Sequence, residues 1–354
     1  MPHDHQPASA QREPLSPELS DQREIASDPG RPIEQRLEAF EDIFDSEVGD
    51  TSLVRARNVE RAIGLRQLFL KFDGGNPTGT QKDRIAFAQV QDALRRGFDT
   101  VTVATCGNYG AAVALAASVA GLRCEIYVPE HFHAKRLGEM ENVGATIVRT
   151  PGDYEAAVER SQRAAVEREL YDANPGGANT PLQLQAYGEI AYEIYDELRD
   201  VPAVVAVPVS NGTTLAGIYK GFVRLYRRGK TSRIPRMVAG SSSGKNPIVR
   251  SFIKGFEVCQ DLDPAKVRET AVNEPLINWH SFDGDLALAA IRESGGWATH
   301  VSDRKMLSHA RLLLDKEGLS ALPASCAALA VLVERQAREA LPPDRYAVIL
   351  TGRR

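Results

Sequence analysis

Short runs of β-branched and apolar residues alternate along this chain with longer segments of helical spacing, and this alternation constrains the fold more than any other feature. The runs predicted to be strands are 68–72, 101–104, 125–128, 146–148, 204–207, 237–239 and 347–350. Strands that alternate with helices in this way form βαβ units, which build a mostly parallel sheet with helices on its faces. The sequence therefore predicts an α/β protein.

Size and charge narrow the class of protein further. A chain of 354 residues exceeds what one core usually holds, so we expect two domains. The net charge of −4 gives no reason to expect nucleic acid or an anionic membrane as a partner. The sequence contains neither a membrane-spanning apolar run nor a basic-then-apolar signal pattern, so we expect no membrane association and a cytoplasmic location.

The four cysteines are widely scattered. They are Cys106, Cys124, Cys259 and Cys326, and no two of them have the CxxC spacing. Neither a zinc site nor a disulfide framework is indicated, and we expect no bound metal.

Residues 1–45 are rich in proline, serine, glutamine and charged side chains. Such a composition buries too little apolar surface to offset the entropy of ordering the chain. We therefore expect an N-terminal flexible tail, with the ordered fold beginning near Gly49.

A glycine- and proline-rich turn follows the first predicted strand, in the stretch 71–84, KFDGGNPTGTQKDR. Glycine permits positive φ and proline fixes φ, so the turn places Lys82 on the first turn of the next helix. From the residues alone, a lysine beside Asp83 and Arg84 is ordinarily a solvated side chain on a helix face.

The segment NPTGTQKDR, 76–84, resembles the NPTGSFKDR signature of threonine synthases, which are pyridoxal phosphate (PLP) enzymes of the tryptophan-synthase-β fold, fold type II. The resemblance implies that Lys82 is catalytic and forms the Schiff base with PLP. It also implies a large PLP-binding domain, 46–84 and 191–354, and a small mobile domain, 85–190, with the cofactor between them. Relatives are often dimers, so we expect a homodimer.

The segment TCGNYG, 105–110, joins a predicted strand to an alanine-rich helix. By shape alone it is a tight turn, although unpaired N–H groups at a helix start attract anions. It resembles the family's S-S-G-N-T-G loop, which implies that Asn108 contacts the 3′-oxygen of the cofactor. The substrate carboxylate would be bound by four neighbours: Thr105, Cys106, Gly107 and Tyr109.

The segment SNGTT, 210–214, also follows a strand and precedes a helix. Backbone amides, hydroxyls and a helix N-terminus together suit a phosphate group. The segment resembles the family's G-N-G-G-N loop, which implies that the cofactor phosphate is held by Ser210, Asn211, Gly212, Thr213 and Thr214. The C-terminal LTG similarly resembles a family strand end, which implies that Thr351 bonds the pyridine nitrogen.

The resemblance implies an enzyme, a lyase that eliminates or replaces a group at Cβ or Cγ of a small amino acid, either threonine synthase or a specialised paralogue. One alternative is a β-replacement enzyme, dehydratase or ammonia-lyase acting on serine-, threonine- or phosphoserine-like substrates. Another is a catalytically silent relative that binds PLP. Gly177 stands where the family's NPxR stretch has the arginine that helps to hold the substrate phosphate, and Lys245 either replaces that charge or is simply solvated.

A more distant alternative is a serine hydrolase. GSSSG, 240–244, matches the G-x-S-x-G pattern with Ser242 as nucleophile, and Asp283, His300 and His309 follow it. So short a pattern recurs by accident, and no HGGG-type partner accompanies it.

Overall fold

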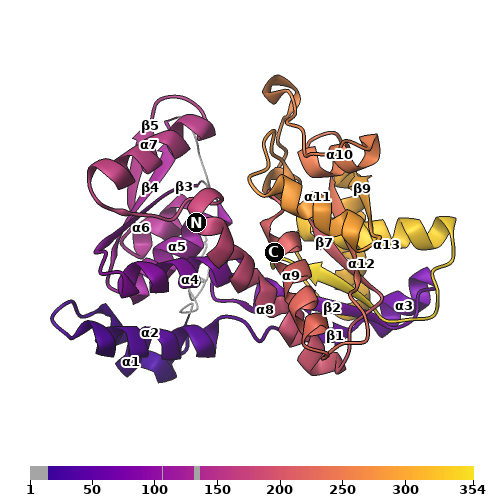
Figure 1. Ribbon diagram of the computed structural model, residues 1–354, viewed down its shortest axis with the longest axis horizontal. Helices are drawn as coiled ribbons and strands as arrows, with labels where there is room; N and C mark the ends of the chain where they lie inside the picture. Colours follow the sequence, from indigo (N-terminus) through magenta and orange to yellow (C-terminus); the bar gives the residue numbers. More distant parts are fainter. Residues whose placement is uncertain (1–14, 106, 131–135) are drawn as a thin grey trace, which may run out of the picture.

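The computed structural model describes residues 15–105, 107–130 and 136–354, and two β-sheets with flanking helices organise them (Figure 1). The larger sheet has the strand order β1-β2-β10-β7-β8-β9, and only β1 runs antiparallel to its neighbour. Its strands are β1 (Leu53–Arg55), β2 (Leu68–Phe72), β7 (Val204–Pro208), β8 (Arg236–Ser242), β9 (Trp297–Val301) and β10 (Tyr346–Leu350).

The smaller sheet is parallel throughout and has the order β5-β4-β3-β6. Its strands are β3 (Thr100–Ala104), β4 (Arg123–Pro129), β5 (Thr146–Thr150) and β6 (Tyr171–Asp172). The mixed α/β fold with mostly parallel sheets is thus confirmed. Three strands were not predicted, because β1 and β6 are too short to show a pattern and β9 mixes a tryptophan and a histidine into its run.

Helices cover both sheets and link them. The helices of the first half are α1 (Ser20–Ser27), α2 (Ile33–Glu47), α3 (Arg57–Ile63), α4 (Lys82–Arg95), α5 (Asn108–Val119), α6 (Leu137–Asn142) and α7 (Tyr154–Glu167). Those of the second half are α8 (Thr180–Leu198), α9 (Thr213–Arg227), α10 (Pro247–Lys254), α11 (Gly284–Glu293), α12 (Asp303–Glu317) and α13 (Ala327–Arg338).

Helix α8 lies between the two sheets in Figure 1 and packs closely on α9. The two helix backbones can come this close because Gly188 of α8 and Gly221 of α9 lack side chains. A Cβ added to Gly221 would lie 2.5 Å from the carbonyl oxygen of Gly188. This close packing fixes the start of α9, where the SNGTT segment lies, relative to α4 and α8.

The expectation of a flexible tail is wrong for residues 15–45. Helix α2 buries Phe40 and Ile43 completely, and the Phe40 ring stacks on Phe87 of α4 with centroids 5.6 Å apart. The apolar residues of α2 recur at helical spacing, a pattern that the polar average over the segment conceals. Residues 1–14 lie outside the described residues.

The predicted domain boundaries remain a prediction. The two sheets fall on opposite sides of them, but the boundary at 84/85 lies inside α4 and the one at 190/191 lies inside α8. Across the parts of the chain that the structure describes, no helix combines the length and the apolar character needed to cross a bilayer.

Candidate functional site

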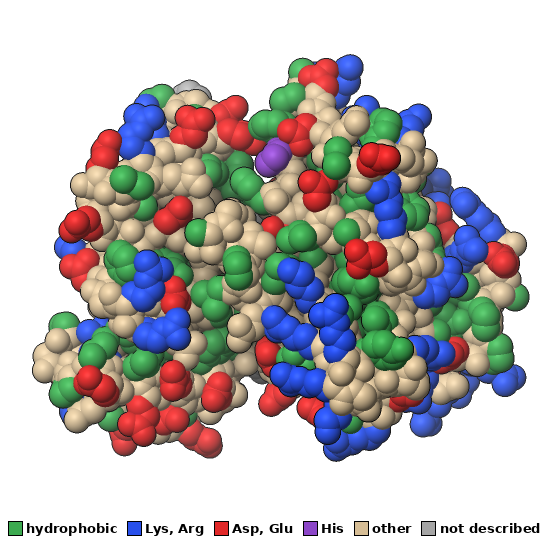
Figure 2. Space-filling model, in the orientation of Figure 1, with side chains coloured by type: hydrophobic (Ala, Val, Ile, Leu, Met, Phe, Trp, Pro, Cys, Tyr) green, Lys and Arg blue, Asp and Glu red, His purple; other side chains and the backbone are tan. Residues whose placement is uncertain are grey.

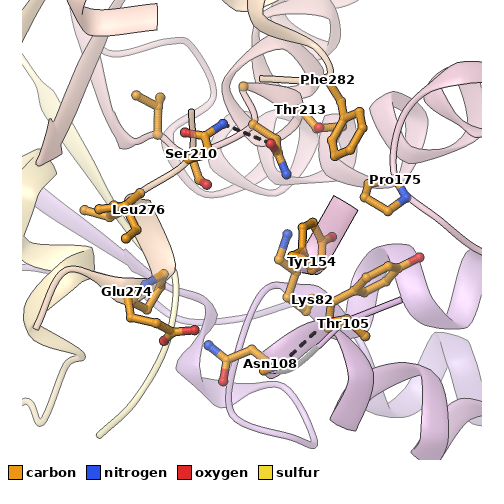
Figure 3. A pocket seen from close by; sticks show the side chains of 18 of the residues that line it. Lys82, Thr105, Asn108, Tyr154, Pro175, Ser210, Thr213, Glu274, Leu276 and Phe282 are labelled. Atoms are coloured by element: carbon orange, nitrogen blue, oxygen red, sulfur yellow. Dashed lines mark hydrogen bonds between the residues drawn. The ribbon is translucent and has the colours of Figure 1, made fainter. Parts of the chain in front are cut away.

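A cavity of about 800 Å³ lies between the two sheets, within the size range of small-molecule sites. On the face drawn in Figure 2, the two lobes meet along a furrow, with acidic side chains and a histidine around its upper end. Figure 3 shows Lys82 and Asn108 on one side of the cavity, and Ser210 and Thr213 on the other. Every predicted site residue that is described lines this cavity, and Cys106 lies outside the described residues.

Lys82 is the first residue of α4, as predicted. The turn before it needs a glycine, since Gly79 has a φ of +87°. The chain beyond β10 then pairs with this turn, because Gln81 donates its backbone N–H to the carbonyl of Thr351 at 2.9 Å, and Thr80 bridges Gly352. Lys82 and Thr351, far apart in the sequence, thereby line the same cavity.

The surroundings of Lys82 favour its uncharged form more than water does. Burial lowers the pKa of Lys82 to about 8, although the carboxylate of Asp283 opposes the decrease. The amine nitrogen lies 5.7 Å from the centroid of the Tyr109 ring and 6.0 Å from that of Tyr187. More of this amine is therefore unprotonated near neutral pH than in an ordinary lysine, which favours its action as a nucleophile or proton acceptor.

The SNGTT segment forms the loop between β7 and α9, and Gly212 shapes it. Gly212 has a φ of +93°, and a Cβ there would lie 2.8 Å from both the Ala287 Cβ and the Asp283 carbonyl oxygen. Only glycine fits this position. The loop presents the N-terminus of the 15-residue helix α9 to the cavity, and such a terminus binds anions through its free N–H groups.

The two threonines of this loop differ. The Thr213 hydroxyl donates to Asp283 Oδ2 at 2.5 Å, and the Thr180 hydroxyl donates to the other oxygen of that carboxylate at 2.9 Å. Asp283 thus holds the loop in place, and the hydroxyl hydrogen of Thr213 is already used in this hydrogen bond. Thr214 is half-buried and also lines the cavity.

The residues of the TCGNYG segment are divided between the cavity and the wall behind it. The Asn108 side chain accepts a hydrogen bond from Arg136. The Tyr109 ring lines the cavity, but its hydroxyl points away from it and lies within hydrogen-bonding distance of Gln89 Oε1 and the Ala173 carbonyl. Tyr109 therefore offers a ligand its ring and not its hydroxyl, which explains how a residue bulkier than threonine fits here.

Thr351 has a partner that the sequence reasoning missed. Ser325, fully buried just before α13, lies within hydrogen-bonding distance of it, with 2.9 Å between the two hydroxyl oxygens. Both side chains line the cavity. Ser325 could have been noticed in the stretch 301–332, but its distance from Thr351 in the sequence gives no sign of the contact.

Three other residues from the sequence analysis lie elsewhere. Ser242 is the last residue of β8, buried and paired with Val301, and not at the exposed strand-to-helix turn that a nucleophilic serine occupies. Gly177 and Lys245 are absent from the cavity lining among the described residues, so Lys245 does not supply the missing charge there.

The residues present fit pyridoxal phosphate. An amine of lowered pKa, an amide-rich loop with no room for a Cβ at Gly212, and a pair of hydroxyls line one cavity. They match the aldehyde, the phosphate and the ring nitrogen of the cofactor in chemistry.

Comparison with known proteins identifies the same chemistry. The family described as "Pyridoxal-phosphate dependent enzyme" matches residues 44–352. A threonine synthase of Methanocaldococcus jannaschii is 32% identical over 305 residues, which are 86% of this chain and 74% of that protein. A threonine synthase of Synechocystis sp. is 31% identical over 309 residues, covering 86% and 76%.

Solved structures share the fold. A threonine deaminase from T.th. superimposes with a TM-score of 0.73 and 22% identity, covering 91% of this chain and 98% of that chain. The serine racemase of Dictyostelium discoideum has a TM-score of 0.74 and 17% identity, covering 89% and 96%.

Proposed function

The chain belongs to the family of pyridoxal-phosphate-dependent enzymes, and we propose that it is a threonine synthase-like lyase that eliminates or replaces a group at Cβ or Cγ of a small amino acid. The observation that carries the proposal is the enclosed Lys82 amine, which faces a phosphate-type loop across a cavity large enough for cofactor and substrate together. When bound, pyridoxal phosphate withdraws electrons from the substrate α-carbon, which makes a Cα proton and a nearby leaving group removable.

The chain's own residues divide the work around that cofactor. Lys82 would hold it, and the Lys82 amine would move the proton at Cα. Asn108 would donate to the 3′-oxygen, and Thr351 with Ser325 would hold the pyridine nitrogen. Backbone amides and hydroxyls bind the cofactor phosphate, and they come from Ser210, Asn211, Gly212, Thr213 and Thr214.

The substrate carboxylate would lie at the start of α5, near Thr105, Cys106, Gly107 and Tyr109. Unpaired N–H groups at the start of that 12-residue helix suit a carboxylate. The Tyr109 ring, which lies beside the Lys82 amine, limits the size of the substrate there.

The charge of the lining distinguishes among substrates. Among the described residues that line the cavity, Lys82 is the only lysine or arginine. The acidic lining residues are Asp153, Glu155, Glu159, Glu269 and Glu274. Glu274 Oε1 lies only 3.6 Å from the point where Gly107 would carry a Cβ, so an acidic side chain borders the predicted substrate loop, where burial and the nearby Glu269 raise its pKa. A dianionic phosphate would meet repulsion here, without the bidentate partner that an arginine supplies.

This charge favours a second candidate within the same chemistry: a β-replacement enzyme, dehydratase or ammonia-lyase on serine- or threonine-like substrates with an uncharged leaving group. We expect serine, threonine or O-acetylserine to give a kcat/KM at least about tenfold above O-phosphoserine and O-phosphohomoserine, equivalent to about 1.4 kcal/mol. Steady-state assays with the purified holoenzyme measure the ratio, and Glu274→Gln should narrow it. A preference for O-phosphohomoserine would identify a threonine synthase, while no turnover of any amino acid would contradict the catalytic proposal.

We also propose a cytoplasmic homodimer, since members of the resembled family are often dimers. Sedimentation of the purified protein should give about twice the mass of the 38.6 kDa chain. A species of single-chain mass at micromolar concentration would refute this.

A further inference from the structure

Arg136 is a largely buried cation beside the site that the proposed function does not use. It immediately precedes α6, and its side chain is only 20% exposed. Its Nη1 donates to Asn108 Oδ1 at 2.8 Å, and its Nη2 donates to the carbonyl oxygen of Thr78 at 3.0 Å. A third partner is Glu139, whose Oε2 lies 2.8 Å from Nε and 2.7 Å from Nη2.

We propose that Arg136 is a positioning residue that orients the Asn108 amide toward the cofactor and ties it to the turn that carries Lys82. The proposal rests on the proposed contact between Asn108 and the 3′-oxygen.

The orientation follows from donor chemistry. A guanidinium can only donate hydrogen bonds, so the side-chain atom of Asn108 that faces Arg136 must be the amide oxygen. The amide nitrogen of Asn108 is then the end left for the cavity, which Asn108 lines. An N–H donor there favours an anionic oxygen on the ligand, whereas a rotated amide would present a repelling carbonyl oxygen.

The link to Lys82 runs through Thr78. The backbone N–H and the hydroxyl of Thr78 both donate to the Asp83 carboxylate, at 2.9 Å each, and Asp83 follows Lys82 directly. Arg136 therefore joins three segments: α6, the start of α5, and the turn before α4. Two of these belong to the smaller sheet's half of the fold and the third follows β2 of the larger sheet. The planar fork of arginine serves two acceptors in fixed directions, which a lysine cannot reproduce.

The test compares Arg136→Met with Asn108→Ala in the purified holoenzyme. The readouts are the dissociation constant of pyridoxal phosphate and the position of its visible absorption maximum, which responds to hydrogen bonding of the ligand oxygen. We expect Arg136→Met to weaken cofactor binding about tenfold, the effect of one charge-assisted hydrogen bond, and to shift the maximum in the same direction as Asn108→Ala does. Arg136→Lys should be intermediate, and it provides the measurement if the methionine variant does not fold.

The double variant decides between positioning and general stabilisation. If Arg136 acts through Asn108, adding Arg136→Met to Asn108→Ala should weaken binding by less than about twofold more. Arg123→Met is the matched control, since it removes an exposed arginine paired with Asp99, and it should bind cofactor like the wild type. The proposal would be overturned if Arg136→Met left the absorption maximum unshifted. It would also be overturned if the losses of cofactor affinity in the two single variants multiplied in the double variant. A wild-type protein that binds no cofactor would instead contradict the proposed function itself.

Discussion

Replacing Lys82 by alanine is expected to lower turnover by about a thousandfold or more, the largest effect on activity that we foresee for a single substitution. Lys82 is the only lysine or arginine among the described residues that line the cavity, so no described neighbour can take over its amine. Its lowered pKa, about 8, leaves more of the amine unprotonated near neutral pH than in an ordinary lysine, which favours both attack on an aldehyde and acceptance of a proton. The variant should remain folded, because removing a lysine from a desolvated position relieves a cost.

The measurement is steady-state turnover with the best substrate, together with the absorption spectrum of the bound cofactor. Lys245→Ala is the matched control, because Lys245 lies outside the cavity lining, and it should retain wild-type turnover. Circular dichroism of both variants confirms that they are folded. Turnover by Lys82→Ala within tenfold of the wild type would exclude Lys82 as the catalytic amine.

Local patterns in the sequence predicted the strands and turns that carry the site. The turn before Lys82, the loop at Gly212 and the strand leading to Thr351 each consist of neighbouring residues whose φ preference, β-branching or apolar run acts within the segment. Each of these segments also resembles a family motif. This is why residues far apart in the sequence could be assigned to one site before any contact was known.

The residues that were missed act over long separations. Asp283 anchors Thr213, Ser325 meets Thr351, and Arg136 reaches Asn108, yet each pair lies in different elements. A carboxylate or arginine of this kind looks like an ordinary surface charge until the fold brings its partner near. Average composition led to the wrong prediction of a flexible tail at α2. The few apolar residues of this helix are spaced so that they face the core, and composition does not record spacing.

Buried charges also hold the turn before Lys82 in place. Arg84 and Asp73 are buried, and the guanidinium forms two bonds to that carboxylate, at 2.8 and 2.9 Å. The same guanidinium bonds both oxygens of Glu193 on α8, at 2.5 and 2.9 Å. Lys71, also fully buried, pairs with Glu193 and donates to the carbonyl of Thr51. Two cations and two carboxylates thus connect β2, α4 and α8 beside the site.

Arg84→Met should lower the free energy of unfolding by about 3–5 kcal/mol, the typical cost of removing one partner from a buried ion pair. Methionine keeps much of the volume, but Asp73 loses its bidentate partner and Glu193 keeps only Lys71. Arg311→Met is the control, because Arg311 and its partner Asp315 are 74% and 47% exposed, and an exposed pair contributes only about 0–1 kcal/mol. Urea unfolding monitored by circular dichroism measures both differences.

The pH dependence separates lost charge pairing from lost packing. Burial alone would raise the pKa of Glu193, but hydrogen bonds and charge from Arg84, with a contribution from Lys71, hold it below the usual 4.5. The stability that this lowered pKa supplies is fully present above pH 4.5 in the wild type, and is lost as the pH falls through the lowered value. In Arg84→Met, Glu193 lacks this partner and should take up its proton at a higher pH than in the wild type. Protonation neutralises the Glu193 carboxylate, so the variant loses less stability in acid than at neutral pH. The difference in stability between wild type and variant should therefore be widest at neutral pH and should narrow as the pH falls below 4.5. A difference that stays the same size in acid would show that packing, and not charge, accounts for the loss.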